Sequence, residues 1–173
     1  MILGLDISTS ITGATVLDKS GKVVYCEAWD TRKFKSTFIK ADTIQSHLRE
    51  LKSKYDIKHV YIEQSLQMFR PGFSSARTLM MLAKFNGVVS WMCYELFKIT
   101  PEYVAAVSAR KAIGITVPRG TPAKQVVLEH IKTTIPDFAY ELTKAGNPKP
   151  GTYDRADSIV IALSGKHLTS SSK

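Results

Sequence analysis

The sequence predicts one α/β domain, a five-stranded mixed sheet with helices packed on it. Two observations predict this fold class. Three short apolar segments separated by turns open the chain, a pattern typical of an antiparallel meander. Beyond them, segments with helical spacing of apolar residues alternate with short apolar segments, which is typical of helices that cover a sheet. No linker or internal repeat divides the 173 residues, which are enough to bury one core.

The N-terminal half is expected to contain four strands and one helix. The turn between the second and third strands has the hairpin sequence Asp18-Lys19-Ser20-Gly21. Apolar residues at helical spacing predict an amphipathic helix over residues 38–55. The strands are expected at residues 2–7, 12–17, 22–29 and 59–62, the last of them ending at Glu63.

The C-terminal half is expected to contain three helices and the fifth strand. Thr121 and Pro122 have the N-cap and first-turn pattern of a helix. A polar, proline-rich loop over residues 136–151 precedes the last helix, and residues 111–115 give no clear assignment. The helices are expected at residues 74–98, at 121–134 and from 153 onward, the strand at 103–107, the domain over 1–168, and a flexible tail at 169–173.

The charge balance restricts the class of partner. Lys and Arg number 24 against 15 Asp and Glu, giving a net charge of +9. Such a chain favours a polyanion, most simply nucleic acid, over a membrane surface. No apolar run approaches the ~18 residues that span a bilayer, and the N-terminus lacks the basic leader of a signal peptide. The two cysteines, Cys26 and Cys93, are isolated and have no metal-type spacing, so we expect a reducing, intracellular setting.

Four acidic residues are candidates for chemistry. Asp6 lies inside an apolar strand, where an unpaired carboxylate is costly to bury. Glu63 ends the fourth strand, and the two acids emerge at one region of the sheet if these strands are neighbours. Asp154 and Asp157 stand three residues apart in the first turn of the last helix and share a face. For this pair alone, helix capping and dipole complementation are the ordinary alternative.

The chemistry of such a cluster follows from its charge. Four gathered carboxylates repel one another unless divalent cations bind between them. Hard oxygen ligands, without Cys or His at ligand spacing, suit Mg²⁺ or Mn²⁺ rather than zinc. Two such ions, about 3.5–4 Å apart, activate a water and stabilise the leaving 3′ oxygen of a phosphodiester. On a basic chain, this predicts a nuclease with two metal ions in its active site.

Three short motifs occur in register: Gly4-Leu5-Asp6-Ile7-Ser8, Ile62-Glu63-Gln64 and Asp154-Arg155-Ala156-Asp157. Together they resemble the RuvC-type Holliday junction resolvases of the ribonuclease H-like superfamily, over nearly the whole chain. The resemblance implies a ribonuclease H-like fold in which the four acids are the metal-binding catalytic residues. It also implies a homodimer that resolves four-way DNA junctions by two symmetric nicks.

The resemblance extends to basic and aromatic residues. Lys124 matches a family lysine early in the helix after the fifth strand, which implies contact with the scissile phosphate. A second basic residue of the family corresponds loosely to Arg110 or Lys111. Bacterial members carry a wedging aromatic residue three positions after the strand-end glutamate, where this chain has Leu66, a departure that fits a divergent viral or organellar member. The candidates to replace the wedge are Phe69 and Phe73.

Two long windows, residues 64–94 and 103–128, contain no acidic residue. Both follow strands that should end near the carboxylates, so they predict a cationic rim for DNA phosphates around a negative site. The alternative is a merely solvated basic face. The candidate DNA-binding residues are Phe69, Arg70, Phe73, Arg77, Arg110, Lys111, Arg119 and Lys124.

One side of the helix at 74–98 carries the small residues Ala76, Ala83, Gly87 and Ser90. We expect this side to pack against the sheet, and a dimer interface is the alternative. Three alternatives to junction resolution also stand. They are a nuclease of the same superfamily that cuts other branched DNA or hybrids, a non-catalytic nucleic-acid-binding module, and a nucleotide-binding protein of the actin and sugar-kinase type. The last shares a first hairpin like residues 3–10 but needs roughly twice this length.

Overall fold

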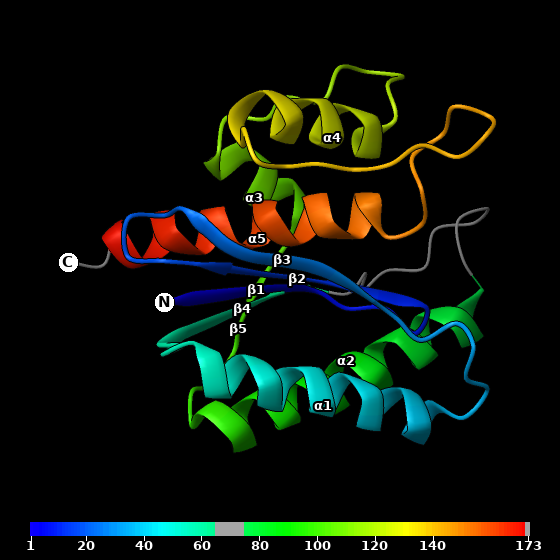
Figure 1. The fold of residues 1–173 in the computed structure, drawn as a ribbon, viewed down its shortest axis with the longest axis vertical. Helices are drawn as coiled ribbons and strands as arrows, with labels where there is room; N and C mark the ends of the chain where they lie inside the picture. The colour runs from blue at the N-terminus through cyan, green and yellow to red at the C-terminus, as the bar shows by residue number, and fades with distance from the viewer. Residues whose placement is uncertain (65–74, 172–173) are drawn as a thin grey trace.

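The computed structural model describes residues 1–64 and 75–171. Figure 1 shows a central sheet with helices on both faces. One face is covered by α1 (Thr37–Lys54) and α2 (Ala76–Phe97). The other face is covered by α5 (Thr152–Ser171), above which lie α3 (Ala106–Ala112) and α4 (Ala123–Thr134). No helix in these ranges is long and apolar enough to cross a bilayer.

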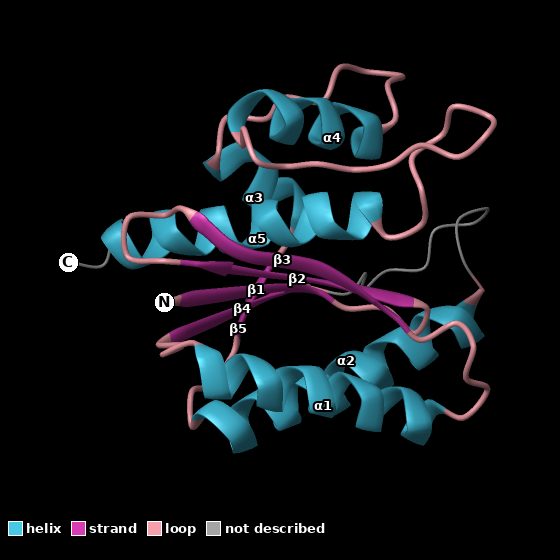
Figure 2. Ribbon diagram, in the orientation of Figure 1, coloured by secondary structure: helices cyan, strands magenta, loops and turns pink. Residues whose placement is uncertain are grey.

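The five-stranded mixed sheet is confirmed. Its strands are β1 (Ile2–Asp6), β2 (Ile11–Leu17), β3 (Val23–Asp30), β4 (His59–Glu63) and β5 (Glu102–Val104). They lie in the order β3-β2-β1-β4-β5, with an antiparallel β1-β2-β3 meander and with β4 parallel to β1 and β5 parallel to β4 (Figure 2). β1 and β4 are therefore neighbours, and their carboxyl ends meet at one edge of the sheet.

Alternation along the strands divides the core into two layers. Leu3 and Leu5 pack in the cluster formed with α1 and α2, whereas Ile2 packs in the cluster on the α5 side. In β4, Ile62 packs in the cluster with α1 and α2, and Tyr61 packs in the cluster on the α5 side. Because successive strand side chains point to opposite faces, the last residue of each strand faces the α5 layer.

The C-terminal half differs from the prediction in three places. Residues 106–107, expected to end the fifth strand, belong instead to α3, because β5 stops at Val104. The residue capping α4 is Pro122, without a side-chain hydrogen bond, so the N-cap assignment of Thr121 was wrong by one position. Residues 169–171, assigned to the tail, continue α5, where Thr169 Oγ1 lies 2.9 Å from Tyr61 Oη.

The small residues of α2 do not pack as predicted. Ala76, Ala83 and Gly87 are exposed, and a methyl group added to Gly87 would contact nothing within 4 Å. Only Ser90 of this set is buried. The core-facing side of the helix is instead the large apolar one, which includes Phe85 and Val89. Helical spacing showed that the small residues share a side, but core packing was the wrong interpretation of that side.

Candidate metal and nucleic-acid site

Strand pairing brings the first two acids together. Leu5 pairs with Ile62. Asp6 and Glu63 are the next residues on the two parallel strands, so they lie side by side at the strand ends. Asp6 also lies opposite Gly13 of the antiparallel neighbour β2. Both acidic residues are partly exposed and lie on the face covered by α5.

Glycines let α5 lie directly on this face. A Cβ on Gly4 would lie 2.6 Å from the Ala162 nitrogen. A Cβ on Gly13 would lie only 1.9 Å from the carbonyl oxygen of Asp154. Since no side chain fits in either place, the backbone of α5 approaches the strands closely. The first turn of the helix, which carries Asp154, is thereby held above the strand residue that faces Asp6.

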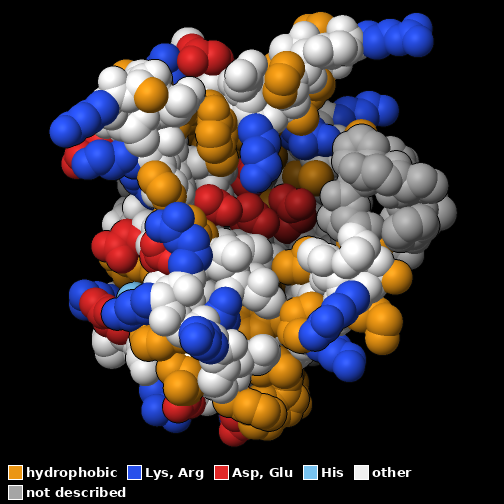
Figure 3. All heavy atoms as spheres, turned by 90° about the vertical axis from the view of Figure 1, so that its right-hand side faces the viewer, with side chains coloured by type: hydrophobic (Ala, Val, Ile, Leu, Met, Phe, Trp, Pro, Cys, Tyr) orange, Lys and Arg blue, Asp and Glu red, His pale blue; other side chains and the backbone are white. Residues whose placement is uncertain are grey.

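The remaining acid lies one turn further along α5. The first turn contains Asp154 as its acid, so Asp157 falls in the second turn rather than the first. Three residues apart, the two side chains still share a face of the helix. Figure 3 shows an acidic patch in a hollow of this end of the molecule, bordered by Lys and Arg side chains.

The pKa values show how strongly these carboxyl groups affect one another. Burial raises the pKa of Asp6 well above its usual range, and the charges of Glu63, Asp157 and Asp154 raise it further. Burial, followed by the charge of Asp157, raises the pKa of Glu63 to about 7. Burial is also the main cause that raises the pKa of Asp157 to about 6 and that of Asp154 by a smaller shift. The four carboxyl groups thus form one electrostatic cluster.

Two of the predicted basic residues lie beside this cluster. The charge of Lys124 lowers the pKa of all four acids, opposing the effect of burial. Arg110 acts in the same direction on the pKa of Glu63 and Asp157. The first turn of α4 therefore brings the charge of Lys124 close enough to act on all four carboxylates, and α3 does the same with Arg110 for Glu63 and Asp157.

The other predicted DNA-binding residues fall into two groups. Lys111 is exposed on α3, Arg119 is exposed in the connection to α4, and Arg77 is exposed in the first turn of α2. Their exposure leaves all three open to a partner. Three candidates lie outside the described residues, together with the wedge position Leu66: Phe69, Arg70 and Phe73.

The donor set fits a hard divalent cation. All four side chains offer carboxylate oxygens, and burial, the largest cause in each case, raises their pKa values, so a bound cation would favour their charged forms. In residues 1–64 and 75–171, no three Asp, Glu, His or Cys side chains are already placed to hold one ion. The four carboxylate side chains are partly exposed.

Three further residues shape the site, although the sequence patterns assigned them no role. Gly13, which has no side chain, allows the backbone of α5 to lie close to β2, as described above. Asn86 of α2 donates from Nδ2 to the carbonyl oxygen of Glu63 at 3.3 Å and so holds the end of β4. Arg32 is ion-paired with Asp30, and its charge lowers the pKa of Asp154. A glycine inside a strand pattern is a signal that could have identified Gly13.

These pKa values predict a pH dependence of metal binding. Metal ligation requires deprotonated carboxylates. We expect Mg²⁺ to raise the unfolding midpoint by several degrees at pH ~8, because a ligand at ~100 times its Kd adds ~2.7 kcal/mol to stability. The rise should disappear by pH ~5.5, where Glu63 and Asp157 take up protons, given pKa values of about 7 and about 6. Thermal unfolding with and without Mg²⁺ at matched ionic strength measures this difference.

The stability of the metal-free protein should fall with rising pH, whereas the Mg²⁺-induced gain in stability grows. Acids with a raised pKa in the folded state keep protons that the unfolded state has released, so stability falls as pH rises from ~4.5 to ~7. An Mg²⁺-induced rise that is equal at both pH values would contradict the carboxylate assignment.

The chain is similar in structure to solved RuvC-type resolvases. With Thermus thermophilus RuvC in complex with Holliday junction substrate, the TM-score is 0.71 at 15% identity, covering 98% of this chain and 94% of that chain. A second Thermus thermophilus RuvC structure gives 0.65 at 16%, covering 99% and 96%. The yeast mitochondrial Holliday junction resolvase Ydc2 gives 0.60 at 14%, covering 98% and 78%. No family model and no curated protein matches the sequence.

These comparisons establish the fold. The chain has the ribonuclease H-like fold of the RuvC-type resolvases over nearly its full length, as the three motifs predicted. At sequence identities of 14–16%, structural similarity shows that the fold is shared. The chemistry has to be inferred from the side chains of this chain.

Proposed function

We propose that this chain, with its ribonuclease H-like fold, is a metal-dependent endonuclease that resolves four-way DNA junctions by paired nicks. The observation that carries the proposal is the cluster of four carboxylates with Lys124 at one edge of the sheet. A chain with net charge +9 supports the choice of DNA as the polyanion. The similar Thermus RuvC was solved with a Holliday junction substrate, which supports the junction as the branched form.

Each residue of the site has a role in this proposal. Asp6, Glu63, Asp154 and Asp157 hold the ions, and their clustered charge makes the site selective for divalent cations. Bound Mg²⁺ or Mn²⁺, two per site, would supply an activated water and stabilise the leaving 3′ oxygen. Lys124 binds a non-bridging oxygen of the scissile phosphate, since its charge acts on the carboxylates and its side chain is exposed.

The basic residues around the site bind the arms of the DNA. Arg110 lies beside the acids and is suited to the phosphates next to the cleaved bond. Lys111, Arg119 and Arg77 are exposed and bind the backbone without reading bases. Phosphate contacts of this kind recognise the shape of a junction, and they make binding sensitive to salt.

We also propose that two copies associate through the exposed side of α2. Met80 and Trp91 are each 59% exposed, and Tyr94 is exposed on the same helical side. Between them lie Ala83 and Gly87, which allow a second helix to approach closely. An exposed apolar side of this length is typical of an interface between proteins. Two sites related by a two-fold axis suit the symmetric cutting of a junction.

Trp91→Lys tests the dimer. Wild-type protein is expected to have the mass of a dimer in size-exclusion chromatography with light scattering, and the variant that of a monomer. Loss of a central aromatic anchor typically costs ~2 kcal/mol or more, about 30-fold in the dimer Kd. The control is Leu142→Lys, an exposed apolar residue in the loop after α4, which should stay dimeric. A dimeric Trp91→Lys variant would contradict the α2 interface.

The proposed reaction is tested by incubating the purified protein with a synthetic four-way junction and Mg²⁺. Nicks at symmetric positions in two opposing strands are expected, and chelation of the metal should stop them. Cleavage of flaps or hybrids instead would favour the alternative nuclease of the same superfamily. A protein that binds junctions but never cuts them would be a non-catalytic module.

A further inference from the structure

Residues 32–40, which lead from β3 into the first turn of α1, carry an exposed aromatic residue among cations. Arg32, Lys33, Lys35 and Lys40 occur here, and no acid interrupts the sequence between Asp30 and Asp42. Phe38, in the first turn of α1, is 86% exposed, and Ile39 beside it is 51% exposed. We call residues 32–40 the basic-aromatic segment. A solvated phenyl ring in such surroundings has no role in the core of this fold.

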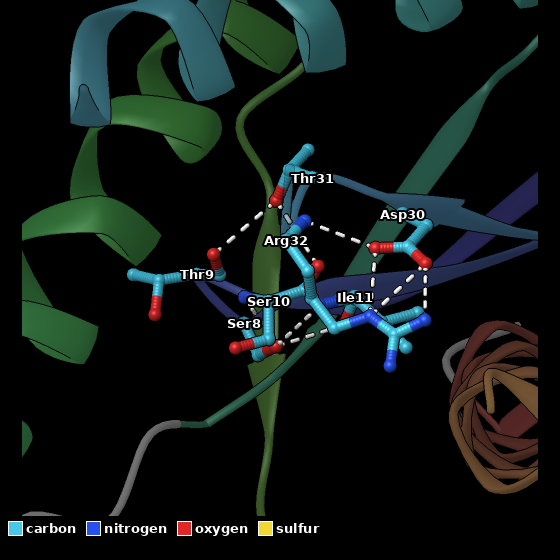
Figure 4. Close-up of polar contacts among 7 residues, drawn as sticks. All are labelled: Ser8, Thr9, Ser10, Ile11, Asp30, Thr31 and Arg32. Atoms are coloured by element: carbon cyan, nitrogen blue, oxygen red, sulfur yellow. Dashed lines mark hydrogen bonds and ion pairs between the residues drawn. The ribbon is translucent and has the colours of Figure 1, made fainter. Parts of the chain in front are cut away.

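The segment is held firmly at its start. Buried Thr31 donates through Oγ1 to the carbonyl oxygens of Thr9 at 3.2 Å and Ser10 at 3.1 Å, and through its backbone nitrogen to Ser10 at 2.9 Å. Figure 4 shows these contacts and the Arg32 guanidinium on Asp30. The segment is thus tied to the turn that directly follows β1.

A second anchor lies in α1 itself. The Lys40 ammonium donates to the Thr9 carbonyl oxygen, and Ser36 caps the helix by accepting from the Ile39 nitrogen. The exposed ring of Phe38 stands between these two anchors, on a backbone that hydrogen bonds fix on both sides. Its presentation to solvent is therefore a feature of the folded chain.

The segment lies at the same end of the molecule as the carboxylates. The turn that anchors it follows Asp6 by two residues, and the charge of Arg32 acts on Asp154. In Figure 1, the beginning of α1 and the beginning of α5 lie at the same end of the sheet. DNA bound over the acids would thus meet a second charged surface on the α1 side.

Charge identifies the partner. Lys33 and Lys35 have no acidic side chain within ion-pair distance in the described part of the chain. A second copy docking symmetrically on the segment would bring like charges together, which is unfavourable. A nucleic acid offers phosphates to the ammonium groups and base faces to the ring.

We propose that the basic-aromatic segment is a DNA-contact surface in which Phe38 stacks on a base face exposed at the branch point, where the arms part, while Lys33 and Lys35 bind the adjacent phosphates. This inference rests on the proposed function and adds to it a base contact made from outside the predicted DNA-binding residues. Fully paired duplex offers no free base face, so the contact distinguishes branched from linear DNA.

The test compares Phe38→Ala with Phe38→Trp and with the control Leu142→Ala, an exposed apolar residue elsewhere. Each change is made in an Asp6→Asn background, so that binding is measured without cleavage. Phe38→Ala should weaken the affinity for a four-way junction about tenfold and leave duplex affinity unchanged, since aromatic stacking on a base is lost. Phe38→Trp should keep the affinity of the parent protein, and Leu142→Ala should bind normally. The fluorescence of a 2-aminopurine at the branch should change when the parent protein binds and stay unchanged when the Phe38→Ala variant binds.

Each other outcome overturns the inference. Unchanged junction binding by Phe38→Ala would show that the ring makes no contact. Equal losses on junction and duplex would show a general effect instead of stacking, and a changed molecular mass would show that a second copy covers the segment. Wild-type protein that cuts junctions while Phe38→Ala binds normally leaves the proposed function intact. Failure of the wild-type protein to bind any branched DNA would contradict both the Phe38 contact and the proposed function.

Discussion

Asp6→Asn is expected to abolish cleavage of a four-way junction while leaving junction binding intact. The amide keeps the size of the carboxylate but removes the charge that holds the ions. Metal ions contribute several kcal/mol of transition-state stabilisation, so the loss in cleavage rate should be at least ~10³-fold. The proposed DNA contacts are made by basic residues elsewhere on the surface, which the substitution does not touch.

The thermal stability of the Asp6→Asn variant tests the role of Asp6 independently of cleavage. Asp6 is repelled by Glu63, Asp157 and Asp154 in the metal-free protein. Removing its charge should raise the unfolding midpoint at pH ~8 by ~2–4 °C for each kcal/mol relieved, and the Mg²⁺-induced rise should be lost. Asp42→Asn, on an exposed face of α1, is the matched control and should do neither. A variant with unimpaired cutting would overturn the assignment of Asp6 as a metal ligand.

Gly13→Ala should damage both the fold and the site. The added methyl group would lie 1.9 Å from the Asp154 carbonyl oxygen and 2.4 Å from its carbonyl carbon. These are backbone atoms, so the first turn of α5 must move away from β2, and Asp154 and Asp157 move with it. Overpacking of this kind typically costs ~1–3 kcal/mol. Cleavage should fall by more than the folded fraction falls, because Asp154 and Asp157, the proposed metal ligands, are displaced even in the molecules that fold.

Gly87→Ala is the matched substitution for stability, made in the Trp91→Lys background so that the proposed α2 interface is absent, and compared with Trp91→Lys alone. Its new methyl group meets nothing within 4 Å, and alanine favours the helix over glycine by ~0.8–1.0 kcal/mol. Its unfolding midpoint should therefore be unchanged or higher. Thermal unfolding by circular dichroism, with and without Mg²⁺, measures both variants. A Gly13→Ala protein with the wild-type midpoint and the wild-type Mg²⁺ response would contradict the close seating of α5.

The sheet and the acidic cluster could be predicted because both depend on local sequence patterns. Short apolar segments and turn residues defined β1, β2 and β4, and an acid inside or just after such a segment marked Asp6 and Glu63. The joining of these acids with Asp154 and Asp157 required only that β1 and β4 be neighbours and that α5 lie across them. Both conditions hold.

Other features depend on contacts that the local pattern does not contain. Val107 is 70% exposed in α3, and its apolar side chain extended the predicted strand beyond the true end of β5. The side of α2 that faces the core was decided by large residues such as Phe85, which fill the space above the sheet. Asn86 acts on Glu63, 23 residues away in the sequence, and Arg32 acts on Asp154, which belongs to the last helix. No rule of sequence spacing identifies such partners.

One cleavage assay on four substrates in parallel tests most directly whether this protein resolves four-way junctions. A four-way junction, a flap, a linear duplex and an RNA–DNA hybrid, each labelled on every strand, are incubated with the wild-type protein and Mg²⁺. We expect paired, symmetric nicks in the junction and little cutting of the duplex, as the proposed function requires. A junction left intact in Mg²⁺ and in Mn²⁺, while the hybrid or no substrate is cut, would contradict it.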